Sequence, residues 1–253
     1  MTYRFATERP DYSDLASGAV LRSAPGHPAF PVRLASEMFL RAWHALGRPR
    51  LTVWDPCCGS GYLLTVLGLL HRERIAGIVA SDVADGPLRL ARANLGLLSA
   101  DGLTDRAAEL DELADRFQRP AHRTAAEAAR RLRAQLTPGD PPTVVGRADA
   151  LDPEQVAALL AASGPPDLVL TDVPYGEQTT WQGTDPAAGL PGLLDSLAGA
   201  LPAGTMVALA TRGRRVPLPA GTRTAARFRI GTRAVALLRL HDVRPALGER
   251  AGR

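Results

Sequence analysis

Short apolar runs alternate with amphipathic stretches along most of this chain. Five of these runs have the length of buried strands, at 51–54, 75–81, 143–146, 168–171 and 206–210. Between them, apolar positions recur at helical spacing over 62–71, 87–99, 153–162 and 193–200. Two last segments, 223–230 and 232–240, predict an antiparallel strand pair. Because strands that alternate with helices form parallel sheets through right-handed crossovers, we predict an α/β fold with a mostly parallel seven-stranded sheet and an antiparallel last strand.

Two regions interrupt this alternation. Residues 1–50 begin with a segment rich in Arg, aromatic residues and Pro, and they end in apolar positions at helical spacing over 32–46. Residues 101–137 read as two amphipathic helices between the second and third strands. We therefore expect an N-terminal arm and helix (1–50) that pack on an α/β domain (51–253), and this domain carries an inserted helical hairpin at about 101–137.

The first predicted strand leads into a glycine turn, which reads DPCCGSG over residues 55–61. A doubly wound sheet binds its nucleotide-like ligand at such a turn, where glycines let the backbone approach the ligand. Asp55 makes the turn a poor phosphate loop, whereas its carboxylate suits a cationic ligand such as S-adenosylmethionine. A glycine turn without any ligand is the alternative. The candidate cofactor-binding residues here are Asp55, Cys57, Cys58, Gly59 and Gly61.

An acidic residue, Asp82, follows the second predicted strand about 20 residues after the glycine turn. An α/β nucleotide binder places an acid at this point on the ribose hydroxyls. A carboxylate can accept hydrogen bonds from both hydroxyls at once. We therefore predict that Asp82 belongs to the cofactor site, with a simple turn-capping role as the alternative.

The fourth predicted strand ends in a second motif, Asp172-Val173-Pro174-Tyr175. Together with the glycine turn, this corner resembles class I S-adenosylmethionine-dependent methyltransferases. It is similar to the Asp/Asn-Pro-Pro-Tyr/Phe motif of enzymes that methylate exocyclic amines of nucleic-acid bases, although Val173 stands where Pro is usual. The resemblance implies a Rossmann-like class I methyltransferase fold with catalysis at these four residues. The Asp172 carboxylate and the Val173 carbonyl would accept hydrogen bonds from the amine, and Tyr175 would stack on an unstacked base.

The same resemblance implies further cofactor contacts. Members of the superfamily contact the adenine amine just after the third strand, where this chain has Asp149 and Ala150. The segment around Phe30 resembles the motif that amine methyltransferases place against the cofactor. An ordinary turn at Asp149 and a Pro-rich entry loop at Phe30 are the alternatives.

Composition limits the cellular compartment and the class of binding partner that we expect for this protein. All 30 basic residues are Arg and the net charge is +4, which favours a polyanionic partner. The 2 Cys are adjacent, so they lack both a disulfide partner and metal-ligand spacing. The apolar runs are too short for a membrane span, and we expect a cytoplasmic protein without a metal.

Arginines near the end of the chain are the candidates for contact with a polyanionic substrate. The candidate substrate-binding residues are Arg212, Arg214, Arg215, Arg227 and Arg229.

Over its whole length the chain resembles the avilamycin-resistance methyltransferases of antibiotic-producing bacteria. The similarity covers the N-terminal arm, the glycine turn, the helical insertion and residues 171–181. It implies S-adenosylmethionine-dependent methylation of a guanine base in 23S ribosomal RNA, with that RNA or the large ribosomal subunit as partner. It also implies resistance to an orthosomycin antibiotic. We expect a monomer or weak dimer.

The residues alone lead only as far as a base-amine methyltransferase, and a ring nitrogen stays open as the target. Methylation of another base amine or of a small molecule is one alternative, and a non-catalytic RNA-binding module is another. C5-pyrimidine methylation is disfavoured because no Cys lies near Asp172 in the sequence, and a dehydrogenase is disfavoured because the Gly-x-Gly-x-x-Gly spacing is absent. The helical insertion serves either as a solvated lid or as an arm that contacts RNA.

Overall fold

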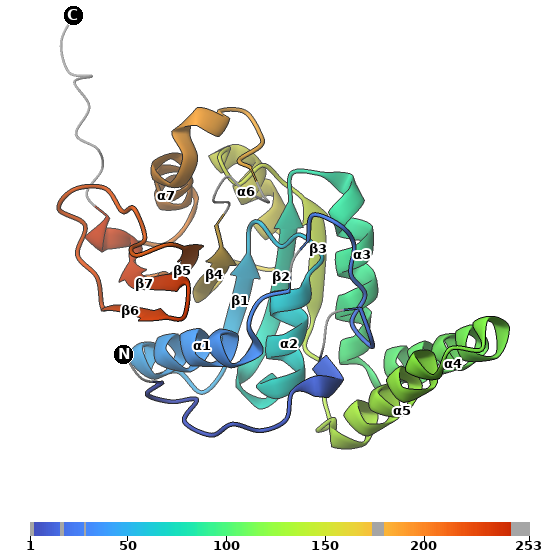
Figure 1. Ribbon diagram of the computed structural model, residues 1–253. Helices are drawn as coiled ribbons and strands as arrows, with labels where there is room; N and C mark the ends of the chain where they lie inside the picture. Colours follow the sequence, from blue (N-terminus) through green and yellow to red (C-terminus); the bar gives the residue numbers. More distant parts are fainter. Residues whose placement is uncertain (1–2, 16–17, 28, 174–179, 244–253) are drawn as a thin grey trace, which may run out of the picture.

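One seven-stranded sheet organises the computed structural model, which describes residues 3–15, 18–27, 29–173 and 180–243 (Figure 1). The strand order is β3-β2-β1-β4-β5-β7-β6, in which β1 to β5 are parallel and β7 is antiparallel to both β5 and β6. This topology confirms the predicted sheet. The strands are β1 (Leu51–Asp55), β2 (Ile75–Asp82), β3 (Thr143–Arg147), β4 (Leu168–Asp172), β5 (Met206–Arg212), β6 (Ala226–Ile230) and β7 (Arg233–Arg239).

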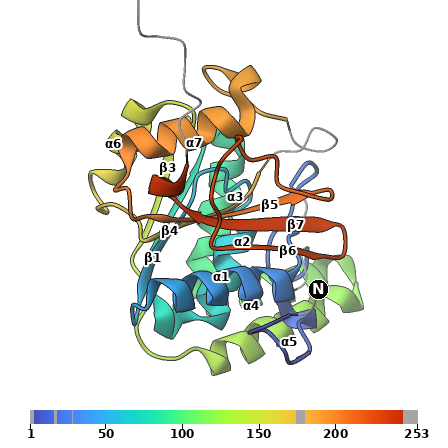
Figure 2. The same ribbon diagram turned by 90° about the vertical axis from the view of Figure 1, so that its left-hand side faces the viewer.

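Helices cover both faces of the sheet (Figures 1 and 2). One face packs against α1 (Val32–Leu46), α2 (Tyr62–Leu70) and α3 (Asp85–Leu95), and the other packs against α6 (Pro153–Leu160) and α7 (Gly189–Ala200). Each face therefore buries its own apolar cluster. Short 3₁₀ turns lie at Ser13–Leu15, Arg72–Arg74, Gly96–Leu98, Pro186–Ala188 and Leu240–Asp242.

Individual Gly and Pro residues explain where two of the helices end and begin. The predicted helix over 32–46 is confirmed, and it stops because Gly47 adopts a left-handed φ of 65° while its N–H donates to the Trp43 carbonyl at 3.1 Å. The helix predicted from Pro87 begins two residues earlier, at Asp85. Pro87 is tolerated in the first turn because the N–H groups there have no intrahelical partner.

The insertion between α3 and β3 consists of α4 (Ala100–Phe117) and α5 (Pro120–Gln135), which pack on each other at the end of the molecule far from β6 (Figure 1). Ser99 caps α4 by accepting the Gly102 N–H at 3.0 Å. Many Arg side chains of this hairpin pair with acids, as in Arg123–Asp115, Arg130–Asp111 and Arg131–Asp14. Much of the positive charge on the hairpin is therefore balanced locally.

The N-terminal arm is tied to α1 by a buried acid. Glu37 accepts the backbone N–H groups of Arg4, Phe5 and Ala6 at 2.8–2.9 Å. The same carboxylate accepts from Arg41 at 2.6 Å. These bonds therefore hold the start of the arm against α1.

The carboxyl ends of the parallel strands meet at one edge of the sheet. Asp55 ends β1, Asp82 ends β2, Asp172 ends β4, and Asp149 lies two residues after β3. The strand order reverses between β1 and β4, and open α/β sheets bind their ligands at such a switch point. This edge is therefore where a functional site is expected.

Candidate active site

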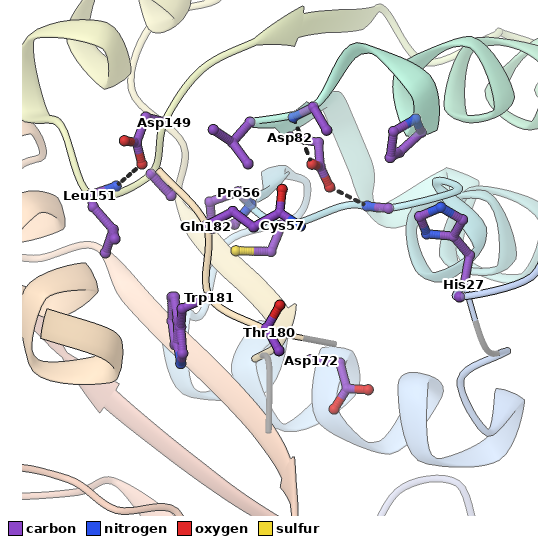
Figure 3. A pocket seen from close by; sticks show the side chains of 16 residues that line it. His27, Pro56, Cys57, Asp82, Asp149, Leu151, Asp172, Thr180, Trp181 and Gln182 are labelled. Carbon is purple, nitrogen blue, oxygen red and sulfur yellow. Dashed lines mark hydrogen bonds between the residues drawn. The ribbon is translucent and has the colours of Figure 1, made fainter. Parts of the chain in front are cut away.

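A cavity of about 320 Å³ opens at this edge of the sheet (Figure 3). A smaller cavity of about 80 Å³ adjoins it and shares Gly26, His27, Cys57, Gly59 and Asp172 as lining residues. Figure 3 shows Asp82, Asp149, Asp172 and Trp181 arranged around the larger space. Side chains from β2, β4, the N-terminal arm and the loop after β4 therefore converge on one site.

Most of the predicted catalytic and cofactor-binding residues lie at these two cavities. Gly61 and Val173, although described, line neither of them, and Pro174 and Tyr175 fall outside the described residues. The predicted residues that line the larger cavity are Cys57, Gly59, Asp82, Asp149, Ala150 and Asp172, and the smaller one adds Phe30, Asp55 and Cys58.

Gly59 and Gly61, the two glycines of the turn, have different structural roles. Gly59 has a φ of +51°, and its N–H donates to Asp82 Oδ2 at 3.0 Å. A Cβ on Gly59 would lie 3.3 Å from His27 Nδ1, so a side chain would narrow the cavity. Gly61 has a φ of +70°, and a Cβ there would lie 3.0 Å from the Ala91 backbone. Gly61 therefore permits close packing of α2 on α3 instead of lining the cavity.

Asp82 braces the turn and still faces the cavity (Figure 3). Its Oδ2 accepts from Gly59 N at 3.0 Å, and its Oδ1 accepts from Ala84 N at 3.1 Å. Each carboxylate oxygen can accept a second hydrogen bond. The side chain is therefore held in place while it keeps capacity for a ligand hydroxyl.

A buried acid, Asp55, lines the smaller cavity. Burial raises the pKa of Asp55 to about 7, against the hydrogen bond that its carboxylate accepts from Cys57 N at 3.1 Å. Burial also raises the pKa values of the Cys57 and Cys58 thiols well above their usual range, and both cysteines are free. The thiols therefore stay protonated, which makes them poor nucleophiles and poor metal ligands.

The Asp149 carboxylate already accepts hydrogen bonds from nearby residues. Its carboxylate accepts from Leu151 N at 2.9 Å, from Thr184 Oγ1 at 2.8 Å and from Thr184 N. The adjacent Gly183 has a φ of +115°, and a Cβ there would meet Asp149 at 2.4 Å. Asp149 thus fastens the loop that carries Trp181 over the cavity, a role that the sequence did not suggest.

Asp172 is held by an arginine from β7. Arg233 Nη1 donates to both carboxylate oxygens, at 2.6 and 2.5 Å, and its guanidinium lies 4.7 Å from the centre of the Phe30 ring. Burial raises the pKa of Asp172 to about 6, although the positive charges of Arg233 and Arg212 oppose this rise. Asp172 is therefore an ionised carboxylate at neutral pH with more basic character than an exposed Asp.

Sequence reasoning missed several residues of this site. Arg233 was not among the predicted site residues, although it lies opposite Arg212 in the antiparallel pair of β5 and β7. His27, which lines both cavities, was not among them either. Trp181, half-buried, lines the larger cavity together with Thr180 and Gln182. The sequence feature that could have pointed to Trp181 is an aromatic residue shortly after the Asp172 motif.

The predicted substrate-binding arginines line neither of these two cavities. A third cavity, of about 210 Å³, is lined by Arg214, Arg215, Arg227 and Arg229, and Arg212 is exposed at the end of β5. Among the described residues, no three His, Cys, Asp or Glu side chains are grouped so that they could hold a metal ion. Within the same residues, no helix is both long and apolar enough to cross a membrane.

The chain is closely similar to proteins of known activity. It is 54% identical to a 23S rRNA (guanine(2535)-N(1))-methyltransferase of Streptomyces viridochromogenes, over 244 residues that cover 95% of this chain and 97% of that protein. Two solved structures of the rRNA methyltransferase AviRa from S. viridochromogenes, at 1.5 and 2.4 Å, match with TM-scores of 0.87 and 0.89. Their sequences are 51% and 52% identical to this one, and the matches cover 96% and 98% of this chain and 98% and 100% of theirs.

A family model gives the same result. The model for the rRNA methyltransferase AviRa matches residues 1–233, which include every residue that lines the first two cavities. This match confirms the resemblance to the avilamycin-resistance methyltransferases that the N-terminal arm, the glycine turn, the helical insertion and residues 171–181 indicated. The chain therefore belongs to the AviRa family of rRNA methyltransferases.

Proposed function

We propose that this protein transfers a methyl group from S-adenosylmethionine to N1 of a guanine in 23S ribosomal RNA, and that the modification protects the ribosome from an orthosomycin antibiotic. The observation that carries the proposal is the Asp172 carboxylate, paired with Arg233, at a cavity that it shares with the glycine turn. The relative at 54% identity supplies the base and atom by its name. The proposed atom is a ring nitrogen, which the sequence had left open beside an exocyclic amine.

The larger cavity suits the nucleoside part of this cofactor. Asp82 keeps acceptor capacity for ribose hydroxyls, and Ala150 and Leu151 offer apolar surface beside them. Asp55 lies in the adjoining space, where ionisation of its buried carboxyl would be favoured by a nearby cation. S-adenosylmethionine, when bound, supplies a methyl group on a positively charged sulfur.

Asp172 then acts on the guanine. N1 of guanine carries a hydrogen that must leave when the nitrogen is methylated, and the Asp172 carboxylate accepts this proton. A base works best when its pKa lies near the operating pH, and burial brings the pKa of Asp172 to about 6. Arg233 keeps the carboxylate oriented and ionised until the proton arrives. The Val173 carbonyl, with Pro174 and Tyr175, completes the proposed catalytic corner.

Loss of the Asp82 carboxylate is expected to weaken cofactor binding. Asp82→Ala should raise the Kd for S-adenosylmethionine roughly ten- to a hundredfold, because charge-assisted hydrogen bonds to the ribose are lost. Isothermal titration calorimetry measures this Kd directly. Asp85→Ala removes a nearby exposed carboxylate and serves as the control. Equal affinities of Asp82→Ala and the wild type, in a folded protein, would remove Asp82 from the site.

The function itself is tested on RNA. The purified protein is incubated with a 23S rRNA transcript and methyl-labelled S-adenosylmethionine, and the labelled base is located by reverse transcription, which stops at N1-methylguanine. We expect one labelled guanine and reduced sensitivity to an orthosomycin in cells that express the protein. Cofactor binding without label in free 23S rRNA or in the large subunit would favour a small-molecule substrate or a non-catalytic RNA-binding role.

A further inference from the structure

A groove lies on the outer part of the sheet, on the face that α7 covers further inward. The loop after β5 and the strands β6 and β7 enclose about 210 Å³. Arg227 and Arg229 project from β6 on this face, and they pair in register with Ala236 and Ala234 of β7. We call this feature the arginine groove, defined by Arg214, Arg215, Arg227, Arg229, Ala234 and Ala236.

The floor and the rim of the arginine groove differ in character. Ala234 and Ala236 are small and buried, so the floor is apolar and leaves room above it. The four arginines are exposed and form the rim. Two of them are steadied by local bonds, Arg227 Nε to Thr224 Oγ1 at 3.2 Å and Arg229 Nε to the Gly231 carbonyl at 3.1 Å. A flat apolar group with negative charge at its edge would fit this combination.

No ion pair between described residues compensates the charge of the rim. Within the described part of the chain, no carboxylate forms an ion pair with Arg214, Arg215, Arg227 or Arg229. The helical hairpin contrasts with this, because Arg123, Arg130 and Arg131 there all pair with acids. The arginine groove is therefore an attractive site for phosphate, since a guanidinium can bind phosphate oxygens in a bidentate manner.

The groove is also close to the proposed catalytic residue. β7 begins at Arg233, which binds Asp172, and its next residue, Ala234, belongs to the groove floor on the opposite face of the sheet, so the end of β7 separates the two sites. Ala236 lies three residues from Arg233, which corresponds to about 10 Å along a strand. A nucleotide next to the target guanine could therefore reach the groove while the guanine occupies the active site.

We propose that the arginine groove binds an unpaired nucleotide adjacent to the target guanine, with its base on the Ala234–Ala236 floor and its phosphate on the arginine rim. This inference rests on the proposed function. Base faces stack readily on guanidinium planes and apolar surfaces, which suits single-stranded RNA. An acidic protein segment would use the rim but would have no need for a flat apolar floor.

The test is steady-state methylation of a 23S rRNA transcript. Arg227→Ala/Arg229→Ala is expected to raise the KM for RNA roughly tenfold, with kcat and the Kd for S-adenosylmethionine within about twofold of the wild type. The matched control is Arg119→Ala/Arg133→Ala, which removes the same charge from exposed positions at the hairpin and should leave KM nearly unchanged. A wild-type KM for folded Arg227→Ala/Arg229→Ala would overturn the proposal.

A second variant separates the base from the phosphate. Ala236→Leu fills the floor but keeps all four arginines, so it should also raise KM for RNA if a base lies there. Ala236→Val serves the same purpose should the Leu variant fold poorly. An unchanged KM in a folded floor variant would leave a site for phosphate alone and would refute the base pocket.

Two further outcomes are distinguishable. A wild-type protein that does not methylate RNA contradicts the proposed function and not merely the groove. A wild type that methylates free 23S rRNA with the same KM as the arginine variants, while those variants fail on the assembled large subunit, would assign the groove to a ribosomal protein and would overturn the nucleotide proposal.

Discussion

Asp172→Ala is expected to lower kcat about a hundredfold or more, because the variant has lost the group that accepts the guanine proton. Affinity for S-adenosylmethionine should stay within a few-fold of the wild type, since the predicted ribose and glycine-turn contacts lie elsewhere. Single-turnover methylation of 23S rRNA measures the chemical step, and calorimetry measures the cofactor Kd. Asp195→Ala, which removes an exposed acid from α7, is the matched control and should be as active as the wild type.

The Asp172→Asn variant distinguishes methylation of the ring nitrogen N1 from methylation of an exocyclic amine. An amide oxygen can still accept a hydrogen bond but cannot take up a proton at neutral pH. If N1 is the target, Asp172→Asn should be nearly as slow as Asp172→Ala, because the N1 proton has no acceptor. If an exocyclic amine is the target, the Asn variant should keep substantial activity. Near wild-type turnover of Asp172→Ala would rule out both forms.

Arg233→Ala is expected to shift the pH dependence of methylation. The wild-type rate should fall as the pH drops through about 6, because Asp172 is then protonated and cannot accept a proton. Removal of the Arg233 charge should raise the pKa of Asp172 further, by roughly 1–3 units. With a pKa between about 7 and 9, half or more of the carboxylate would be protonated at pH 7, and kcat/KM at that pH should fall about two- to a hundredfold, with recovery at higher pH.

The measurement is kcat/KM for 23S rRNA between pH 5 and 9. Arg233→Lys keeps the charge but not the planar group, so its acidic limb should return toward that of the wild type. Arg239→Ala, at the other end of β7, changes the charge equally and should keep the wild-type profile. A uniform loss of activity at every pH would indicate that Arg233 contributes only to the fold and does not change the pKa of Asp172.

The element pattern and part of the site could be predicted from the sequence. Apolar runs and helical spacing are local properties, and they placed all seven strands within a few residues of their observed positions. Because parallel strands expose their carboxyl ends at one edge, the acids that follow such strands must lie near each other. The sequence therefore predicted that Asp82 and Asp172 meet at this edge, where both line the larger cavity, and the resemblance to class I methyltransferases came from the glycine turn and the Asp172 motif.

The contacts between distant segments were decided by tertiary structure alone. Arg233 lies 61 residues after Asp172, and only the antiparallel return of β7 brings its guanidinium onto that carboxylate. Asp149 binds Thr184, 35 residues later, because the loop after β4 folds back over the cavity. The arginine groove arises from the register between β6 and β7. The sequence by itself thus determined which elements form and in what order, since that depends on local periodicity, whereas side-chain partners depend on how those elements pack.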